Sequence, residues 1–232
     1  MAQILIHSII NSAKRVPKKV HLATRFFLNI IFPQKCFVCG AKNKILCEKC
    51  LMKIDYPSLP ESNKIFAATD YNDEFAKKAI WLLKYRGVKL LAEPLAELIC
   101  RRLPPSVKYS ISDALNWVII PIPLSKKRLK QRGYNQTELI ARYLSNKMSV
   151  KTKTGVLYKL KDTPSQVSIK DREKRMNNLK DSFGIKNAEA INGKNIILID
   201  DVSTTGATIR ETRKILRSAG AKKVIAMVVA RG

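Results

Sequence analysis

The stretch Ile196-Ile-Leu-Ile-Asp-Asp-Val-Ser-Thr-Thr-Gly-Ala-Thr208 decides the fold of this chain. Its apolar run, with Asn195 before it, predicts a buried strand of a parallel sheet that carries Asp200 and Asp201 at its carboxyl end. A tight turn follows and enters a helix that is expected to run from Gly206 to Ala219, with Gly220 as its C-terminal cap. Open α/β sheets bind ligands at the carboxyl ends of their strands, so this turn is the first candidate for a binding site.

The turn offers the donors that a phosphate group needs. Three threonine hydroxyls, the close backbone approach allowed by Gly206 and the positive end of the following helix all attract an anion. The two carboxylates would repel a phosphate, but they suit ribose hydroxyls, or Mg²⁺ held through its waters. The pattern therefore predicts a phosphorylated sugar, and the alternative is an ordinary strand-turn-helix that uses Asp and Thr for capping. The expected binding residues are Asp200, Asp201, Ser203, Thr204, Thr205, Gly206, Ala207 and Thr208.

This segment closely resembles the signature for 5-phosphoribosyl-1-pyrophosphate (PRPP) in type I phosphoribosyltransferases. The resemblance implies a central parallel sheet with flanking helices and a flexible hood over the site. It also implies that the turn holds the 5-phosphate, that the acids address the ribose diol, and that Mg²⁺ arrives with the pyrophosphate.

The rest of the chain also alternates between strand and helix patterns. Strands are expected at 65–71, 117–122 and 224–230, with helical periodicity through 75–99 and 138–147. Residues 159–183 are polar, charged and weakly periodic, which favours a loop. This order predicts an α/β fold with a parallel sheet.

A second anion site is expected directly after the strand at 117–122. The segment 121–136 reads Pro-Ile-Pro-Leu-Ser-Lys-Lys-Arg-Leu-Lys-Gln-Arg-Gly-Tyr-Asn-Gln and is strongly basic. Among its cations we expect Arg132 to be the main pyrophosphate ligand, because Gly133 beside it allows an unusual backbone turn. The alternative is a solvated basic turn. The candidate cations are Lys126, Lys127, Arg128, Lys130 and Arg132.

Pro-Ile-Pro-Leu-Ser followed by Arg-Gly-Tyr-Asn-Gln resembles the ComF family, amidophosphoribosyltransferase-like proteins that include GntX. The resemblance covers roughly residues 34–232. The chain departs from the family pattern in two places. Its finger has no further Cys after the first four, and Lys159-Leu-Lys161 stands where an Arg is expected. Both departures concern the finger and the hood and leave the PRPP turn intact. The other agreeing segments are Leu83-Lys-Tyr-Arg-Gly87, Thr163-Pro-Ser-Gln166, Arg175-x-x-Asn178, Phe183 and two Cys-x-x-Cys pairs.

Those pairs, Cys36-x-x-Cys39 and Cys47-x-x-Cys50, predict a closed structural zinc site. Redox dithiols or free core cysteines are the alternatives, and Cys100 is expected in the core. Phe37 and the surrounding lysines suit single-stranded nucleic acid, although zinc that only stabilises the fold is an equal alternative. The lysines are Lys35, Lys42, Lys44, Lys49 and Lys53.

The charge of the chain is extreme, with 44 Lys and Arg against 18 Asp and Glu, a net +26. Such a charge favours polyanionic partners, with solubility alone as the alternative. The first acid is Glu48, and eight basic residues precede it.

We expect three parts: a basic amphipathic extension at 1–33, a four-cysteine zinc finger at 34–58 and the phosphoribosyltransferase-like domain at 60–232. The extension is expected to be helical. It lacks the charged leader and cleavage site of a signal peptide, and its apolar run is too short to span a bilayer. Its partners are expected to be an anionic membrane surface, the body of the protein or another protein.

Two functional hypotheses follow. In the first, PRPP loses pyrophosphate and an acceptor attacks C1 of the ribose. Asp200 and Asp201 would stabilise the positive charge at the ribose, and Arg132 and Mg²⁺ would stabilise the leaving pyrophosphate. Such an enzyme would act in nucleotide or amine metabolism on an acceptor that the sequence does not identify. Its zinc finger would then be purely structural. Both histidines, His7 and His21, lie in the extension, so no histidine base is expected in the core.

In the second hypothesis the fold handles DNA. ComF-like proteins are implicated in natural competence, and the resemblance implies action on incoming single strands in the cytoplasm, with other DNA-uptake proteins and the inner face of the membrane as further contacts. We combine the two: DNA handling is the process and PRPP binding is the chemistry.

Overall fold

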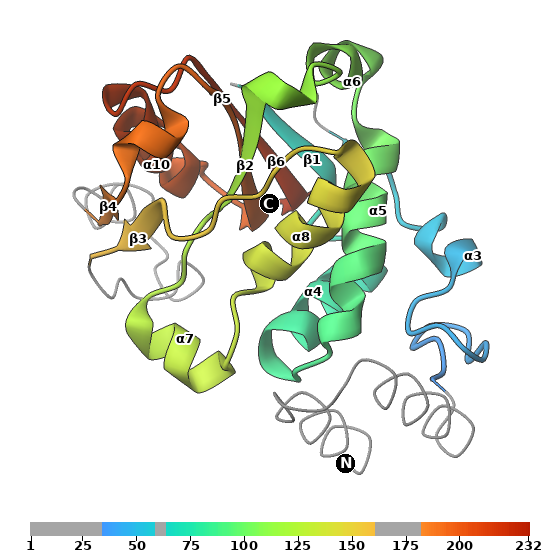
Figure 1. The fold of residues 1–232 in the computed structure, drawn as a ribbon. Helices are drawn as coiled ribbons and strands as arrows, with labels where there is room; N and C mark the ends of the chain where they lie inside the picture. Colours follow the sequence, from blue (N-terminus) through green and yellow to red (C-terminus); the bar gives the residue numbers. More distant parts are fainter. Residues whose placement is uncertain (1–33, 59–63, 161–181) are drawn as a thin grey trace, which may run out of the picture.

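The computed structural model describes residues 34–58, 64–160 and 182–232 (Figure 1). Its centre is a four-stranded parallel sheet in the order β1-β6-β5-β2. The predicted α/β fold is thus confirmed. The extension at 1–33, and the expected motifs at 163–166 and 175–178, lie outside the described residues. The strands are β1 (Ile65–Asp70), β2 (Trp117–Pro121), β5 (Asn195–Ser203) and β6 (Lys223–Arg231).

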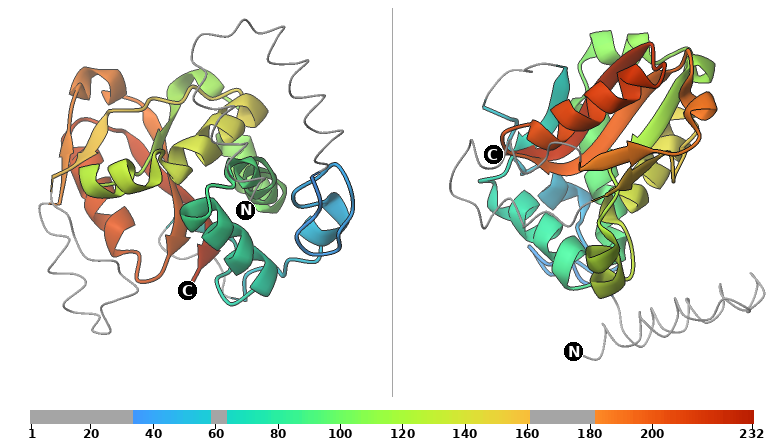
Figure 2. Two further views of the ribbon diagram at one scale, coloured as in Figure 1. Left: turned by 90° about the horizontal axis from the view of Figure 1, so that it is seen from below. Right: turned by 90° about the vertical axis from the view of Figure 1, so that its left-hand side faces the viewer.

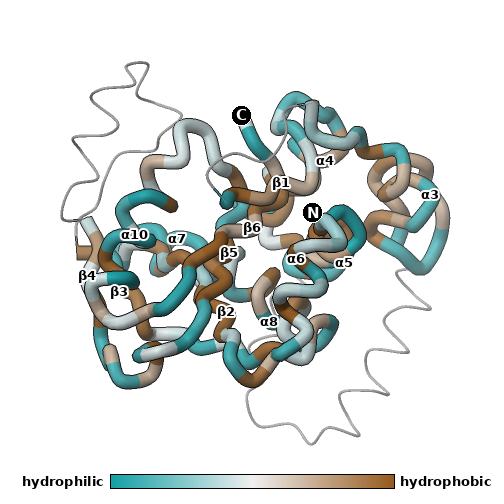
Figure 3. The backbone as a smooth tube through the Cα atoms, turned by 90° about the horizontal axis from the view of Figure 1, so that it is seen from above, coloured by the Kyte–Doolittle hydropathy of each residue, from teal (hydrophilic) through white to brown (hydrophobic). Residues whose placement is uncertain are grey.

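Alternating side chains divide the core between the two faces of the sheet. Ile197 and Ile199 of β5 pack under helices α4 (Glu74–Tyr85), α5 (Ala92–Arg102) and α8 (Gln136–Met148). Ile196 and Leu198 pack on the other side, against α10 (Ala207–Ser218). The right-hand view of Figure 2 shows α10 in front of the sheet with the green helices behind. In Figure 3 the central strands are mostly hydrophobic and α10 shows hydrophilic residues. This two-sided burial explains the uninterrupted apolar run that identified β5.

Strand β5 is longer than predicted. The sequence placed its end at Ile199, but pairing with β6 continues through Asp200↔Val228 to Ser203↔Arg231. Because β6 is also nine residues long, its backbone supplies ladder partners past the apolar run. The two acids therefore lie on a rigid strand, and the turn into α10 begins only at Thr204.

Three segments contain secondary structure that the sequence patterns did not predict. Pro105 begins a short helix, α6 (Pro105–Ser110), as proline at the first helical position allows. The basic segment after β2 is not a turn but a helix, α7 (Lys126–Arg132), capped by the Ser125 side chain. The ends of the expected loop at 159–183 pair as an antiparallel ribbon of β3 (Leu157–Lys159) and β4 (Phe183–Ile185). The remaining short helices are η1 (Lys89–Leu91), η2 (Ala114–Asn116) and η4 (Ala188–Ile191).

The cysteine module contains the short helix α3 (Glu48–Leu51) and packs against the same core as α4 and α5. Leu46 and Ile54 are buried in that core. Arg102 of α5 donates to the carbonyls of Ile54, Asp55 and Ala68, which ties the module to the domain. Within the described ranges, every helix is too short or too polar to cross a membrane.

Candidate functional site

A cavity of about 470 Å³ opens at the carboxyl end of the sheet. The end of β5, the start of α10, the segment from Ile122 to Thr137 and the end of α4 all contribute to its wall. Parallel strands deliver their carboxyl ends to one edge, so these segments meet although they are distant in sequence. The polar residues of the wall include Lys84, Tyr85, Arg128, Arg132, Gln136, Asp200, Asp201, Thr204 and Thr208.

Asp201 is buried and both of its carboxylate oxygens have partners. Lys84 Nζ lies 2.8 Å from Oδ1, and Gln136 Nε2 donates to Oδ2 at 2.7 Å. The same amide accepts a hydrogen bond from the Arg132 guanidinium through its oxygen. The chain Arg132–Gln136–Asp201–Lys84 therefore links α7, α8, β5 and α4 across the cavity wall.

Asp200 is only partly buried and accepts a hydrogen bond from the Asp201 backbone N–H at 2.9 Å. Burial and the charge of Asp201 raise the pKa of Asp200 to about 7. Burial disfavours the charged form of Lys84, but the carboxylates of Asp201 and Asp200 outweigh this effect and raise the Lys84 pKa above its ordinary value. The two acids thus have different roles. The charge of Asp201 is compensated by Lys84, and Asp201 positions Lys84 and Gln136. Asp200 lines the cavity.

The turn residues divide between lining the cavity and shaping the turn. Thr204 and Thr208 line the cavity. Thr205 is used locally, because its hydroxyl accepts from Ala207 N at 3.4 Å and its carbonyl accepts from Arg210 at 2.7 Å. Gly206 has φ +71°, a left-handed conformation that favours glycine at this helix start. The residues that form the turn without lining the cavity are Ser203, Thr205, Gly206 and Ala207.

The basic helix α7 presents only some of its cations to the cavity. Arg128 and Arg132, four residues apart on one helical face, line it. Lys126, Lys127 and Lys130 are exposed and are not among the lining residues. Arg132 also lies over the Tyr85 ring, with its Cζ 5.5 Å from the ring centroid. Gly133, at φ +76°, ends the helix and turns the chain toward α8.

Sequence reasoning did not assign roles to Lys84, Tyr85 or Gln136. The signal was present, because Lys84 and Tyr85 belong to the Leu-Lys-Tyr-Arg-Gly element and Gln136 ends the Arg-Gly-Tyr-Asn-Gln element. The two elements are joined directly, since the Tyr134 hydroxyl donates to the Leu83 carbonyl. Their proximity could not be inferred from spacing, because about fifty residues separate them.

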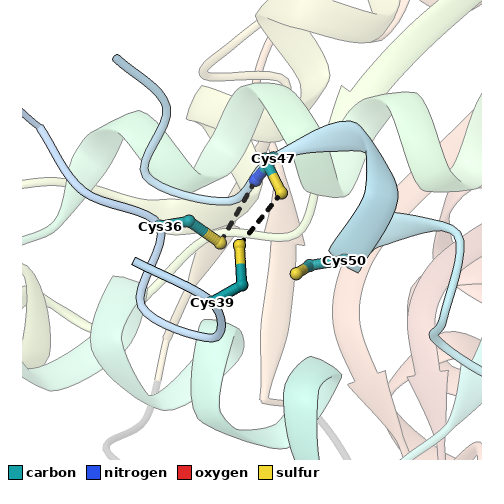
Figure 4. A group of neighbouring side chains, drawn as sticks. All are labelled: Cys36, Cys39, Cys47 and Cys50. Atoms are coloured by element: carbon teal, nitrogen blue, oxygen red, sulfur yellow. Dashed lines mark hydrogen bonds between the residues drawn. The ribbon is translucent and has the colours of Figure 1, made fainter. Parts of the chain in front are cut away.

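The four cysteines of the predicted zinc site lie together, with all Sγ atoms within 4.8 Å of one another (Figure 4). Cys39 Sγ lies 3.6 Å from Cys47 Sγ, close to the sulfur spacing of about 3.8 Å in a tetrahedral zinc-thiolate centre. Burial opposes ionisation of Cys36, but hydrogen bonds from the backbone and from Cys39 lower its pKa to about 6. Burial raises the pKa of Cys50 to about 12, so the four thiols are not uniformly activated, and it is the proximity of four sulfur atoms that fits a metal ion such as zinc.

Phe37, expected to be exposed beside this site, is half-buried against the core, and Lys78 Nζ lies 5.5 Å from its ring centroid. All five lysines of the module are exposed. The module therefore offers charge to solvent, and its exposed aromatic ring is Tyr56, which is 69% exposed and has its ring centroid 4.1 Å from the Arg102 guanidinium carbon, rather than Phe37.

Comparison with known proteins finds a matching domain and several relatives. Residues 131–232 match the phosphoribosyl transferase domain. Competence protein ComFC of Bacillus subtilis is 28% identical over 212 residues, covering 88% of this chain and 80% of that protein. The DNA utilization protein YhgH of Escherichia coli is 25% identical over 190 residues, covering 82% and 79%. Competence protein F of Haemophilus influenzae is 33% identical over 107 residues, which is 46% of each chain. The chain is similar to ComF-family, phosphoribosyltransferase-like proteins.

The similarity agrees with the sheet order and the cysteine cluster, and the Leu-Lys-Tyr-Arg-Gly and Arg-Gly-Tyr-Asn-Gln elements of the ComF pattern meet at the cavity. A hypoxanthine phosphoribosyltransferase from Staphylococcus aureus superposes with a TM-score of 0.35 at 15% identity, over 59% of this chain and 62% of that one.

Proposed function

We propose that this ComF-like protein binds PRPP in the cavity at the end of β5 and handles incoming single-stranded DNA in the cytoplasm during natural transformation. One arrangement of residues supports PRPP binding. An acid beside a threonine-rich helix start faces two arginines across a single cavity. PRPP needs the same three features, for its diol, its 5-phosphate and its pyrophosphate.

Each part of the ligand has a candidate partner. The start of α10, with Thr204 and Thr208, suits the 5-phosphate. Asp200 suits the ribose hydroxyls, because Asp201 is already paired with Lys84. Arg128 and Arg132 suit the pyrophosphate. In the described residues, the cysteines form the only cluster of three or more potential metal ligands. Mg²⁺ is therefore expected to arrive with PRPP, in contact with Asp200 through its waters.

The names of three relatives, together with the net charge of +26, support the DNA half of the proposal. A polycation gains affinity for a single strand by releasing its counterions. Exposed lysines of the cysteine module add to this charge. The module is expected to hold Zn²⁺ in a closed site, because four thiolates leave no position for a substrate.

Transformation of a naturally competent strain, with this gene as its only copy, tests the process. Asp200→Ala/Asp201→Ala is expected to reduce the yield of transformants, and Asp200→Asn, which keeps the buried Asp201–Lys84 pair, should do so at an unchanged protein level. Lys126→Ala/Lys127→Ala, a pair outside the cavity wall, serves as the control. If the acid pair can be removed without loss of transformants, the pocket has no role in DNA uptake.

A phosphoribosyltransferase with an unknown acceptor is the second candidate. The raised pKa of Asp200, about 7, favours it, because a carboxylate near neutrality suits a general base. A screen for pyrophosphate release from PRPP across bases, nucleosides, amines and single-stranded DNA decides between substrate and bound ligand. Release that depends on one acceptor supports an enzyme. PRPP binding without release from any class leaves PRPP as a ligand.

A further inference from the structure

The outer face of helix α4 carries two neighbouring aromatic rings that solvent reaches. Trp81 is 46% exposed and Tyr85 is 61% exposed, and their ring centroids lie 6.2 Å apart. The inner face of the same helix is buried in the core through Ala76, Ala79, Ile80 and Leu83. The two rings are therefore not required for packing α4, and leaving both in water is unfavourable unless a partner uses them.

Cations accompany both rings. The Arg86 guanidinium lies 5.7 Å from the Trp81 ring centroid, and that of Arg132 lies 5.5 Å from the Tyr85 ring. Lys78, one turn before Trp81, is also exposed. We call Lys78, Trp81, Tyr85 and Arg86 the α4 strip.

The α4 strip connects the two sites of the molecule. At one end Lys78 contacts Phe37 of the cysteine module. At the other end Tyr85 lines the cavity beside Lys84 and Arg132. Seven residues separate Lys78 from Tyr85, which is about 10 Å along a helix. A chain bound along the strip would thus run from the cysteine module to the mouth of the cavity.

We propose that the α4 strip binds single-stranded DNA, with bases stacked on Trp81 and Tyr85 and phosphates near Lys78 and Arg86. The inference rests on the proposed DNA function and adds the surface that performs it. Bases of a single strand expose their faces to aromatic side chains, whereas those of a duplex are already stacked on each other. The alternating cations argue against an acyl-chain surface, which would need a contiguous apolar face.

Tryptophan fluorescence of the full chain tests the contact directly. The chain has two tryptophans, and Trp117 is buried with its indole donating to the Ser110 carbonyl at 2.9 Å. Quenching by an oligothymidylate of about 20 nucleotides therefore reports on Trp81. A duplex of the same length is expected to quench much less. Quenching by anionic phosphatidylglycerol vesicles that the oligonucleotide fails to compete with would make the strip a lipid surface and overturn the proposal.

Affinity measured by anisotropy of a labelled oligothymidylate separates stacking from other effects. Trp81→Leu and Tyr85→Leu are each expected to weaken binding about tenfold, because one stacked base is lost. Trp81→Phe retains a ring and is expected to keep most of the affinity. Tyr109→Leu is the matched control, since Tyr109 is 84% exposed on α6 away from the strip. Unchanged thermal melting checks that the variants fold.

The outcomes distinguish the strip from the wider function. If wild type binds the oligonucleotide and Trp81→Leu binds it equally well, the α4 strip is not the DNA-binding surface, but the proposed DNA function is retained. If wild type binds no single strand, both fail. If Trp81→Leu loses DNA but still binds PRPP, as we expect because Trp81 does not line the cavity, the strip and the pocket are separate parts of one protein.

Discussion

Gln136 donates a hydrogen bond from its side-chain nitrogen to Oδ2 of Asp201 over 2.7 Å, joining residues 65 positions apart in the chain. The oxygen of the same amide accepts from Arg132. The acid pair and the basic helix, which the sequence suggested as two halves of one site, are thus connected through a single side chain. The connection fixes the orientation of the amide and holds Arg132 at the cavity wall.

Replacing Gln136 with leucine should therefore damage both stability and binding. Asp201 would keep Lys84 but leave Oδ2 buried without a donor, which costs about 1–3 kcal/mol of the free energy of unfolding. Arg132 would lose its positioning partner, so PRPP affinity should fall as well. Urea denaturation and calorimetry measure the two effects. Gln131→Leu, at an exposed position of α7 that also lines the cavity, is a control for stability alone and should leave the unfolding free energy nearly unchanged; equal losses of stability in both variants would argue against the amide's role.

The two arginines of α7 should matter for PRPP and the exposed lysines should not. Arg132→Ala and Arg128→Ala each remove a charge-assisted contact to the pyrophosphate, which predicts a loss of about tenfold or more in PRPP affinity. Lys126→Ala and Lys127→Ala remove the same charge from outside the cavity wall and should change the affinity less than about twofold at moderate salt. Equal effects of all four substitutions would indicate a general electrostatic attraction without a pyrophosphate site.

Stability should fall as pH rises through the range in which Asp200 titrates. The pKa of Asp200 is raised in the folded protein from its ordinary value of 3.8 to about 7, so the native state binds this proton more tightly than the unfolded chain. By linkage, Asp200 destabilises the fold progressively between about pH 4 and pH 7. Asp200→Asn removes this penalty and should raise the free energy of unfolding above pH 7 by up to about 4 kcal/mol, with little difference at pH 4. Denaturation curves of the two proteins that stay parallel across this range would contradict the assignment.

Zinc should be bound once per chain and should support the core. Cys47→Ser removes one thiolate, and the metal content measured by mass spectrometry should drop to near zero. Leu46 and Ile54 of the same module are buried in the core, so the melting temperature should also fall. Cys100→Ser is the matched control, because Cys100 lies on α5 outside the cluster. Retention of zinc by Cys47→Ser would refute the four-cysteine site.

Much of the fold could be predicted from burial patterns. The strands at 65, 117, 195 and 224 were recognisable because both faces of the sheet are covered, which requires continuous apolar runs. The extension of β5 through Asp200 to Ser203 was missed because the pairing with β6 depends on a long-range partner. The helix at 126–132 was not predicted, since its charges hide the Ser125 cap and the helical spacing of Arg128 and Arg132.

The site was predictable as far as local chemistry extends. The acids, the threonine turn and the cysteine pairs each have a recognisable spacing. The pairing of Lys84 with Asp201 joins distant elements and leaves no periodic trace, so only the family element around Lys84 pointed to it. Likewise, exposure of Phe37 was expected from its place between two cysteines, whereas tertiary packing against α4 half-buries it.

Calorimetric titration of PRPP and of ribose 5-phosphate, each with Mg²⁺, tests the central claim most directly. Wild type should bind PRPP more tightly than ribose 5-phosphate. Arg132→Ala should lose most of that difference while still binding ribose 5-phosphate, and Asp200→Asn should weaken both ligands. If wild type binds neither ligand, or if Asp200→Asn binds PRPP as wild type does, the cavity at the end of β5 is not a PRPP site.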